Sequence, residues 1–88
     1  MNDAQIAATL LNRWQRNDKH ESEVRPTDLL REGGLSFKHY AGVSRDTSDE
    51  FPDGVEIECL TFDDGSRVIR LTARGAVGHS MSWAAVAP

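Results

Sequence analysis

The stretch VEIECLTFDDGSRVIRLTAR, residues 55–74, decides the fold of this chain. Apolar and polar side chains alternate along Val55–Phe62 and again along Ser66–Arg74, and this period of two predicts a pair of β-strands. Between them, Asp63-Asp64-Gly65 has the composition of a tight turn, because glycine accepts the left-handed backbone that such turns need. The stretch therefore predicts a β-hairpin.

The length of the hairpin loop determines which side chains face each other. A two-residue loop, Asp64-Gly65, would place Glu58 opposite Leu71 and Cys59 opposite Arg70. A three-residue loop with Gly65 in a G1 bulge instead matches apolar with apolar residues and an acid with a base. The four predicted pairs are Ile57 with Leu71, Cys59 with Ile69, Val55 with Ala73, and Glu58 with Arg70. Since a slip of one residue exchanges the two faces, this matching favours the three-residue loop.

The two faces of the predicted hairpin differ in composition. We expect one of them to be the core face, with Val55, Ile57, Cys59, Ile69, Leu71 and Ala73. The other face has its polar residues at one end, namely Glu56, Glu58, Arg70 and Thr72. Toward the turn it has Leu60, Phe62 and Val68, which predict an exposed apolar patch typical of an interaction surface. The alternative interpretation is that one of the two predicted helices covers this face, so that Leu60, Phe62 and Val68 are not exposed.

Two helices are predicted before the hairpin. Apolar residues at helical spacing begin near Ala4 and end at Trp14, and a shorter helix follows Pro26. Gly33-Gly34 is a typical end for the second helix. The expected caps are Asn2 or Asp3 for the first helix and Thr27 or Asp28 for the second.

Further strands are expected on both sides of the hairpin. Leu35–Val43 alternates before it, Ser44–Gly54 has the composition of a loop, and Val77–Val86 alternates after it. We therefore predict a single α+β domain, residues 1–88. Its two N-terminal helices pack on a three- or four-stranded antiparallel sheet, a β-meander.

Composition excludes several classes of protein. The chain has 88 residues and a single cysteine, Cys59, so it can form neither an internal disulfide nor a cysteine-based zinc site. We expect no signal peptide, because the N-terminal residues have neither a basic region nor a continuous apolar stretch, and no apolar run is long enough for a membrane span. We therefore expect a cytoplasmic protein that binds no membrane. The net charge of −4 argues against direct binding of nucleic acid. His20, His39 and His79 fall on different segments, so neither a metal site nor a cofactor is predicted.

Negative charge is concentrated in one quarter of the sequence. Between Arg45 and Arg67 there is no lysine or arginine, but there are eight acids: Asp46, Asp49, Glu50, Asp53, Glu56, Glu58, Asp63 and Asp64. The last two are expected to form the turn, and Glu58 is expected to pair with Arg70. The remaining acids predict a surface that attracts a basic protein. The predicted partner-binding residues are Asp46, Asp49, Glu50, Asp53, Glu56, Leu60, Phe62 and Val68.

These observations favour a binding module without catalytic activity. In its size, its acidity and its lack of catalytic motifs, the chain resembles the small cofactor-free proteins of bacteriophages and mobile elements, among them anti-CRISPR proteins. That resemblance implies an inhibitor that docks on a nucleic-acid-handling complex. One alternative is a homo-oligomer or a subunit of a larger complex, which would bury the second apolar sheet face. Another is a small enzyme that uses His39 or His79 with Cys59 or a nearby acid.

Overall fold

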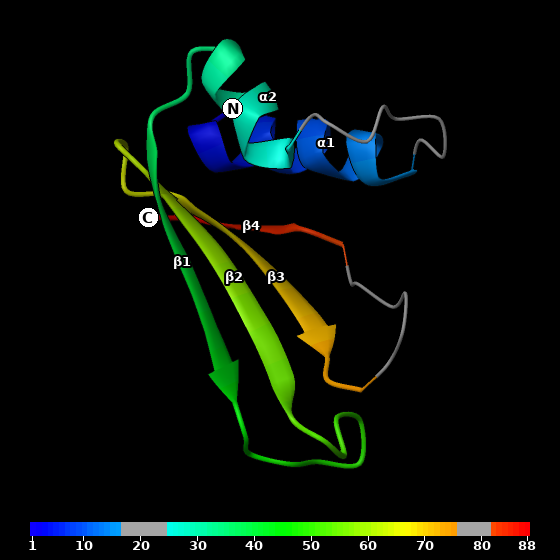
Figure 1. Ribbon diagram of the computed structural model, residues 1–88. Coiled ribbons are helices and arrows are strands. Elements are labelled where there is room, and N and C mark those ends of the chain that lie inside the picture. Colours follow the sequence, from blue (N-terminus) through cyan, green and yellow to red (C-terminus); the bar gives the residue numbers. More distant parts are fainter. Residues whose placement is uncertain (17–24, 76–81) are drawn as a thin grey trace.

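The computed structural model of the chain describes residues 1–16, 25–75 and 82–88. Within these ranges, two helices precede four strands, and the strands follow one another in a single antiparallel sheet of order β1-β2-β3-β4. The elements are α1 (Asp3–Arg16), α2 (Pro26–Glu32), β1 (Phe37–Ser44), β2 (Val55–Phe62), β3 (Arg67–Ala73) and β4 (Ala84–Val86). The predicted α+β fold, two N-terminal helices on a β-meander, is confirmed, and the sheet has four strands (Figure 1).

The first helix begins with a capping box. The backbone N–H of Gln5 donates to Asn2 Oδ1 at 2.8 Å, and the Asn2 N–H donates to Gln5 Oε1 at 2.9 Å. Two of the N–H groups that a helix start leaves without internal partners are thereby satisfied. Of the two predicted caps, Asn2 is the one that the structure shows. The helix buries Ala4, Ala7 and Leu11.

The second helix starts at least two residues earlier than its predicted caps allow. Pro26 is its first residue and Arg25 occupies the N-cap position. No side chain among the described residues caps the helix, so the expectation of a Thr27 or Asp28 cap is wrong. Proline favours this position because its fixed φ is already helical and it has no N–H to satisfy. The predicted end is confirmed: Gly34 has φ of 85°, and the Leu35 N–H donates to the Leu30 carbonyl at 3.0 Å, as in a Schellman motif.

The central hairpin has the predicted register. β2 pairs with β3 so that Ile57 lies opposite Leu71, Cys59 opposite Ile69, Val55 opposite Ala73, and Glu58 opposite Arg70. Gly65 has φ of 84°, and the Phe62 N–H donates to the Ser66 carbonyl at 2.9 Å across the three-residue loop. The three-residue loop with a left-handed glycine is therefore confirmed.

The outer strands differ from the prediction at their ends. β1 begins at Phe37 rather than Leu35, since the Schellman motif still holds Leu35. β4 has only three residues, and part of the predicted strand Val77–Val86 lies outside the described residues. Before β4, the backbone of Trp83 bonds to a side chain instead of a strand. Its N–H donates to Asn12 Oδ1 at 2.8 Å, and its carbonyl accepts from Asn12 Nδ2 at 3.0 Å.

The core lies between the helices and one end of one face of the sheet. Figure 1 shows both helices near the β2–β3 turn, whereas the β1–β2 loop lies at the opposite end of the sheet. The molecule is thin in one direction, with extents of 38 × 33 × 18 Å. In the described part of the chain, the buried hydrophobic residues are Ala4, Ala7, Leu11, Leu30, Leu60, Phe62, Val68 and Trp83. Because the three hairpin residues among them belong to the face predicted to be exposed, the predicted assignment of the two faces is wrong.

Candidate functional site

The predicted apolar patch is part of the core. Leu60 and Val68 are completely buried, and Phe62 is 3% exposed. Phe62 also packs edge-to-face on Phe37 of β1, with ring centroids 5.7 Å apart. In this fold the three hairpin residues have no surface to offer a partner, so the expectation of an exposed patch is corrected.

A physical reason for the exchange of faces lies in where the helices join the sheet. α2 ends at Glu32, a few residues before β1, and β1 starts opposite Phe62. The helices are therefore tethered at the end of the sheet where Leu60 and Phe62 lie. A helix of 14 residues is only about 21 Å long, so it covers one end of one face and leaves the acidic end open. This face is apolar at the tethered end and acidic at the other end. That change of composition along the face is the sequence signal that could have identified it as the covered side.

The face predicted to be the core is instead the uncovered face of the sheet. We call it the open face and define it by six apolar residues, Tyr40, Val55, Ile57, Cys59, Ile69 and Leu71. Side chains alternate along each strand, so these residues point away from Leu60 and Val68. Tyr40 is 62% exposed and the other five are partly exposed. Both described helices lie on the opposite side, and no other described element packs on the open face.

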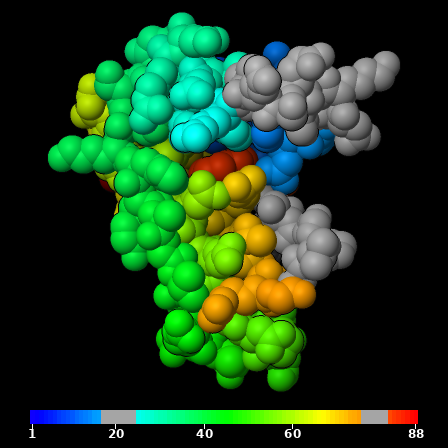
Figure 2. Space-filling view, in the orientation of Figure 1, coloured from blue at the N-terminus to red at the C-terminus, as the bar shows by residue number. Residues whose placement is uncertain are grey.

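Four predicted binding residues lie together on the loop between β1 and β2. Asp46, Asp49, Glu50 and Asp53 are all exposed, and none forms an ion pair with a residue in the described part of the chain. We call this group the acidic loop. The Phe51 carbonyl accepts from the N–H groups of Ser48 and Gly54, at 3.1 Å each, so the loop backbone is held in a defined turn. Figure 2 shows the loop region at the end of the molecule away from the helices.

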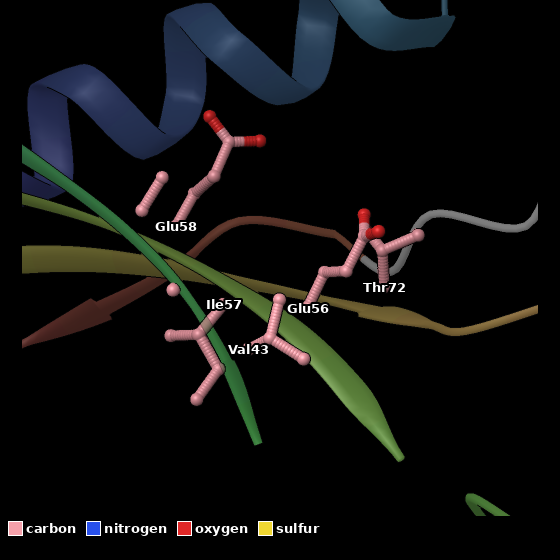
Figure 3. Close-up of a pocket in the computed structure, with 7 residues that line it drawn as sticks. Val43, Glu56, Ile57, Glu58 and Thr72 are labelled. Atoms are coloured by element: carbon pink, nitrogen blue, oxygen red, sulfur yellow. The ribbon is translucent and has the colours of Figure 1, made fainter. Parts of the chain in front are cut away.

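The last predicted acid, Glu56, is separated from the open face. It is exposed on the helix side of β2, beyond the reach of the helices. With Val43, Glu58 and Thr72 it borders a shallow hollow of about 340 Å³. In Figure 3, Glu56 and Glu58 point to the side of α1, whereas Ile57 points away from it. Glu56 therefore faces a different direction from the apolar residues of the open face.

A polar network fills the boundary between the helices and the acidic end of the sheet. The Arg70 guanidinium pairs with Glu58, as predicted, donates to Gln15 Oε1 at 3.2 Å, and lies over the Trp83 ring at 4.6 Å. His39 Nε2 lies 3.3 Å from the other oxygen of Glu58. The network links α1 to three strands next to a cavity of about 270 Å³. Arg70 Nε is buried there without a hydrogen-bond partner.

Of the pairings proposed for an enzyme, the structure brings His39 next to an acid, Glu58, but not next to Cys59. Cys59 belongs to the open face, between Tyr40 and Ile69 on the neighbouring strands. His39 and Glu58 belong to the helix side, because they alternate with Tyr40 and Cys59 along their strands. The sheet therefore separates His39 from Cys59, and His79 lies outside the described residues. Among the described residues, no group of three or more His, Cys, Asp or Glu side chains could hold a metal ion.

The β2–β3 turn completes the cap of the first helix. Asp64 Oδ2 accepts from the Asp3 N–H at 2.9 Å, and Ser66 Oγ accepts from the Ala4 N–H at 3.0 Å. Asp64 also accepts from the Ser66 N–H and hydroxyl. These hydrogen bonds, above all that from the Ser66 hydroxyl, lower the pKa of the Asp64 carboxyl below its ordinary value of 3.8. Asp64 thus forms the turn, as predicted, and in addition docks it on α1.

No protein-family model, curated protein or solved structure matches this chain. None of the described helices is long and apolar enough to cross a membrane. A functional assignment therefore depends on the surface of the molecule itself.

Proposed function

We propose that the chain is a non-catalytic protein-binding module that binds its partner through the open face. The observation behind this proposal is that six apolar side chains share one sheet face with no described element packed on them. An antiparallel sheet with one solvated face usually has polar side chains there. Here the central positions of that face are Ile57, Cys59, Ile69 and Leu71, so a second apolar contact surface accounts for the sequence better than solvation does.

The acidic loop indicates the chemistry of the partner. It lies at the end of the sheet where the open face ends with Val55, and its four carboxylates are exposed. A matching surface has an apolar area with basic side chains next to it. Surfaces that bind nucleic acid are rich in such bases, and exposed acids can compete there with phosphate. An inhibitor of a nucleic-acid-handling complex, of the anti-CRISPR type, is therefore one form that this proposed function can take.

Capture of partners from a lysate of the source cells tests the open face. The bait is the wild-type chain or Leu71→Lys, which places a charge in the apolar area. The matched control is Ile6→Lys, because Ile6 is a 37% exposed apolar residue on α1, on the other side of the sheet. We expect Ile6→Lys to capture the same proteins as the wild type and Leu71→Lys to lose them. Equal capture by all three baits would show that the open face does not bind the partner.

Charge reversal tests the acidic loop separately. Asp49→Lys, Glu50→Lys and Asp53→Lys are combined in one variant, since all three side chains are exposed and a single change leaves most of the field intact. We expect weaker capture and a weaker dependence on salt, because screening acts mainly on exposed charges. If both the affinity and its salt dependence remain unchanged, the loop is a solvated surface and takes no part in binding.

A further inference from the structure

The open face has two basic side chains at the end away from the acidic loop. Lys38 and Arg67 both lie opposite Thr61, one on each neighbouring strand, and both are exposed. They share the face of Ile57 and Leu71, because residues of one face alternate along a strand. The face therefore runs from a basic end, next to the β2–β3 turn, through an apolar middle to the acidic loop.

Other charges near the two ends do not remove this polarity. Arg45 and Arg74 border the acidic loop, so four acids stand against two bases at that end. At the basic end, Asp63 is exposed in the turn, whereas Asp64 is engaged with the start of α1. Among the residues that the structure describes, the strand positions of the open face include Lys38 and Arg67 but no Asp or Glu. The two ends are thus opposite in sign.

A surface with this arrangement is complementary to itself. A two-fold axis in the plane of the interface and across the strands places the acidic loop of one copy over the basic end of the other. We infer that a second copy of this chain occupies the open face, packed sheet on sheet with the ends reversed. This inference rests on the proposed function, since it names the partner of the same face: the chain itself presents an apolar area with bases next to it.

The size of the face indicates a reversible dimer. Three strands of seven or eight residues span about 25 Å by about 15 Å, so two facing copies cover roughly 750 Å² in total, which is below the size of a stable specific interface and in the range of weak, transient ones. Charge complementarity at both ends then selects the reversed arrangement over the one with like ends together. We therefore expect a dimer whose population changes with protein concentration and with salt.

Cys59 provides a probe at the centre of this interface. It lies in the middle of β2, between Tyr40 and Ile69, and it is the only cysteine in the chain. In a sheet-on-sheet dimer the two Cys59 residues face each other across about 10 Å, which is too far for a disulfide but within reach of a short bismaleimide. Any covalent dimer that this reagent forms must join Cys59 to Cys59.

The first experiment combines sedimentation equilibrium with cross-linking of the wild-type chain. We expect a monomer–dimer equilibrium, and we expect the covalent dimer to form at the concentrations where the dimer is populated. Leu71→Lys should remove both, and Ile6→Lys should change neither. In solution scattering, a face-to-face dimer has a radius of gyration of about 17 Å, against about 21 Å for edge-to-edge association, given 13.5 Å for one copy. A larger value, or a dimer without the cross-link, would overturn the inference.

The second experiment tests the reversed ends with exposed residues, whose substitution removes no buried side chain. One variant combines Lys38→Glu with Arg67→Glu, and the other combines Asp49→Lys, Glu50→Lys and Asp53→Lys. Each variant alone has like charges at both ends, and we expect it to dimerise at least about tenfold more weakly than the wild type. An equimolar mixture of the two should recover the dimer. A mixture that stays monomeric would overturn the reversed arrangement.

Failure of this inference can be told apart from failure of the proposed function. A wild-type chain that is monomeric at every concentration overturns the second copy as occupant. If that monomer still captures a partner and Leu71→Lys does not, the open face remains a protein-binding surface. If capture is also insensitive to Leu71→Lys, both the inference and the proposed function are wrong.

Discussion

The two faces of this sheet have similar apolar content but different environments. On the helix side, Leu60 and Val68 are fully buried under α1, while on the open side Ile57 and Leu71 remain partly exposed. The difference shows that alternation in a strand predicts two faces without predicting which one a helix covers. The tether and the length of the helices decide which end of the sheet is covered, and the covered face is the one that is apolar at that end. The open face, which the helices do not cover, is the one that remains available for contact with another protein.

The largest expected effect comes from a matched pair of leucines on the two faces. Leu60→Ala should lower the free energy of unfolding by about 3 kcal/mol, because it removes a fully buried side chain and leaves a cavity. Leu71→Ala should cost about 1 kcal/mol in dilute solution, since its side chain is already partly exposed. Urea unfolding at low protein concentration measures both. Equal losses for the two variants would contradict the difference between the faces.

The next effect concerns the polar network around Arg70, which lies on the helix side of the sheet between the part covered by the helices and the acidic end. Arg70→Met should destabilise the fold by about 2 kcal/mol, because it removes the guanidinium that pairs with Glu58 and the contact with Gln15. Adding Glu58→Gln should recover part of this loss. Arg13→Ala, at an exposed position on α1, should change the stability by less than about 0.5 kcal/mol. Additive effects of the two substitutions would show that Arg70 and Glu58 do not act as a pair.

A smaller effect is expected at the contact between the turn and α1. Ser66→Ala removes the acceptor of the Ala4 N–H and should cost about 1 kcal/mol, the usual value for a lost helix cap. Ser36→Ala is the matched control, because Ser36 is an exposed serine before β1. Thermal unfolding of the two variants compares them. A loss no greater than that of Ser36→Ala would mean that the turn does not hold the helix.

The smallest effect is a dependence on pH. The hydrogen bonds of Asp64 lower its pKa in the folded state, so its contribution to stability is complete above its ordinary pKa of 3.8. That contribution is lost as the pH falls from 3.8 through the lower folded value. Asp64→Asn should therefore lose less stability than the wild type over this acid range. Asp63→Asn, in the same turn, is the control, and identical acid profiles for all three proteins would refute the role of Asp64.

The hairpin could be predicted in detail because its information is local. In one register only, Glu58 lies opposite Arg70 and apolar residues lie opposite apolar residues. Gly65 determines the type of turn, so the register and the turn could both be predicted from 20 residues of sequence. The choice of covered face could not be read in the same way. It depends on contacts such as Leu11 in the core and Arg70 with Gln15, which join segments far apart in the chain. The patch of Leu60, Phe62 and Val68 was therefore misplaced, while the exposure of the acidic loop was foreseen.

The side-chain amide of Asn12 that binds the backbone of Trp83 also has a consequence for the kinetics of folding. These two residues are 71 positions apart, and Asp3 is 61 positions from its acceptor Asp64. Contacts of such long range are slow to form, because the chain must close a large loop before it gains any stabilisation. During synthesis, α1 leaves the ribosome early but has no complete surface to pack on until residue 83 has emerged. Although α1 precedes the other described elements in the sequence, we expect it to be among the last elements to pack on the sheet.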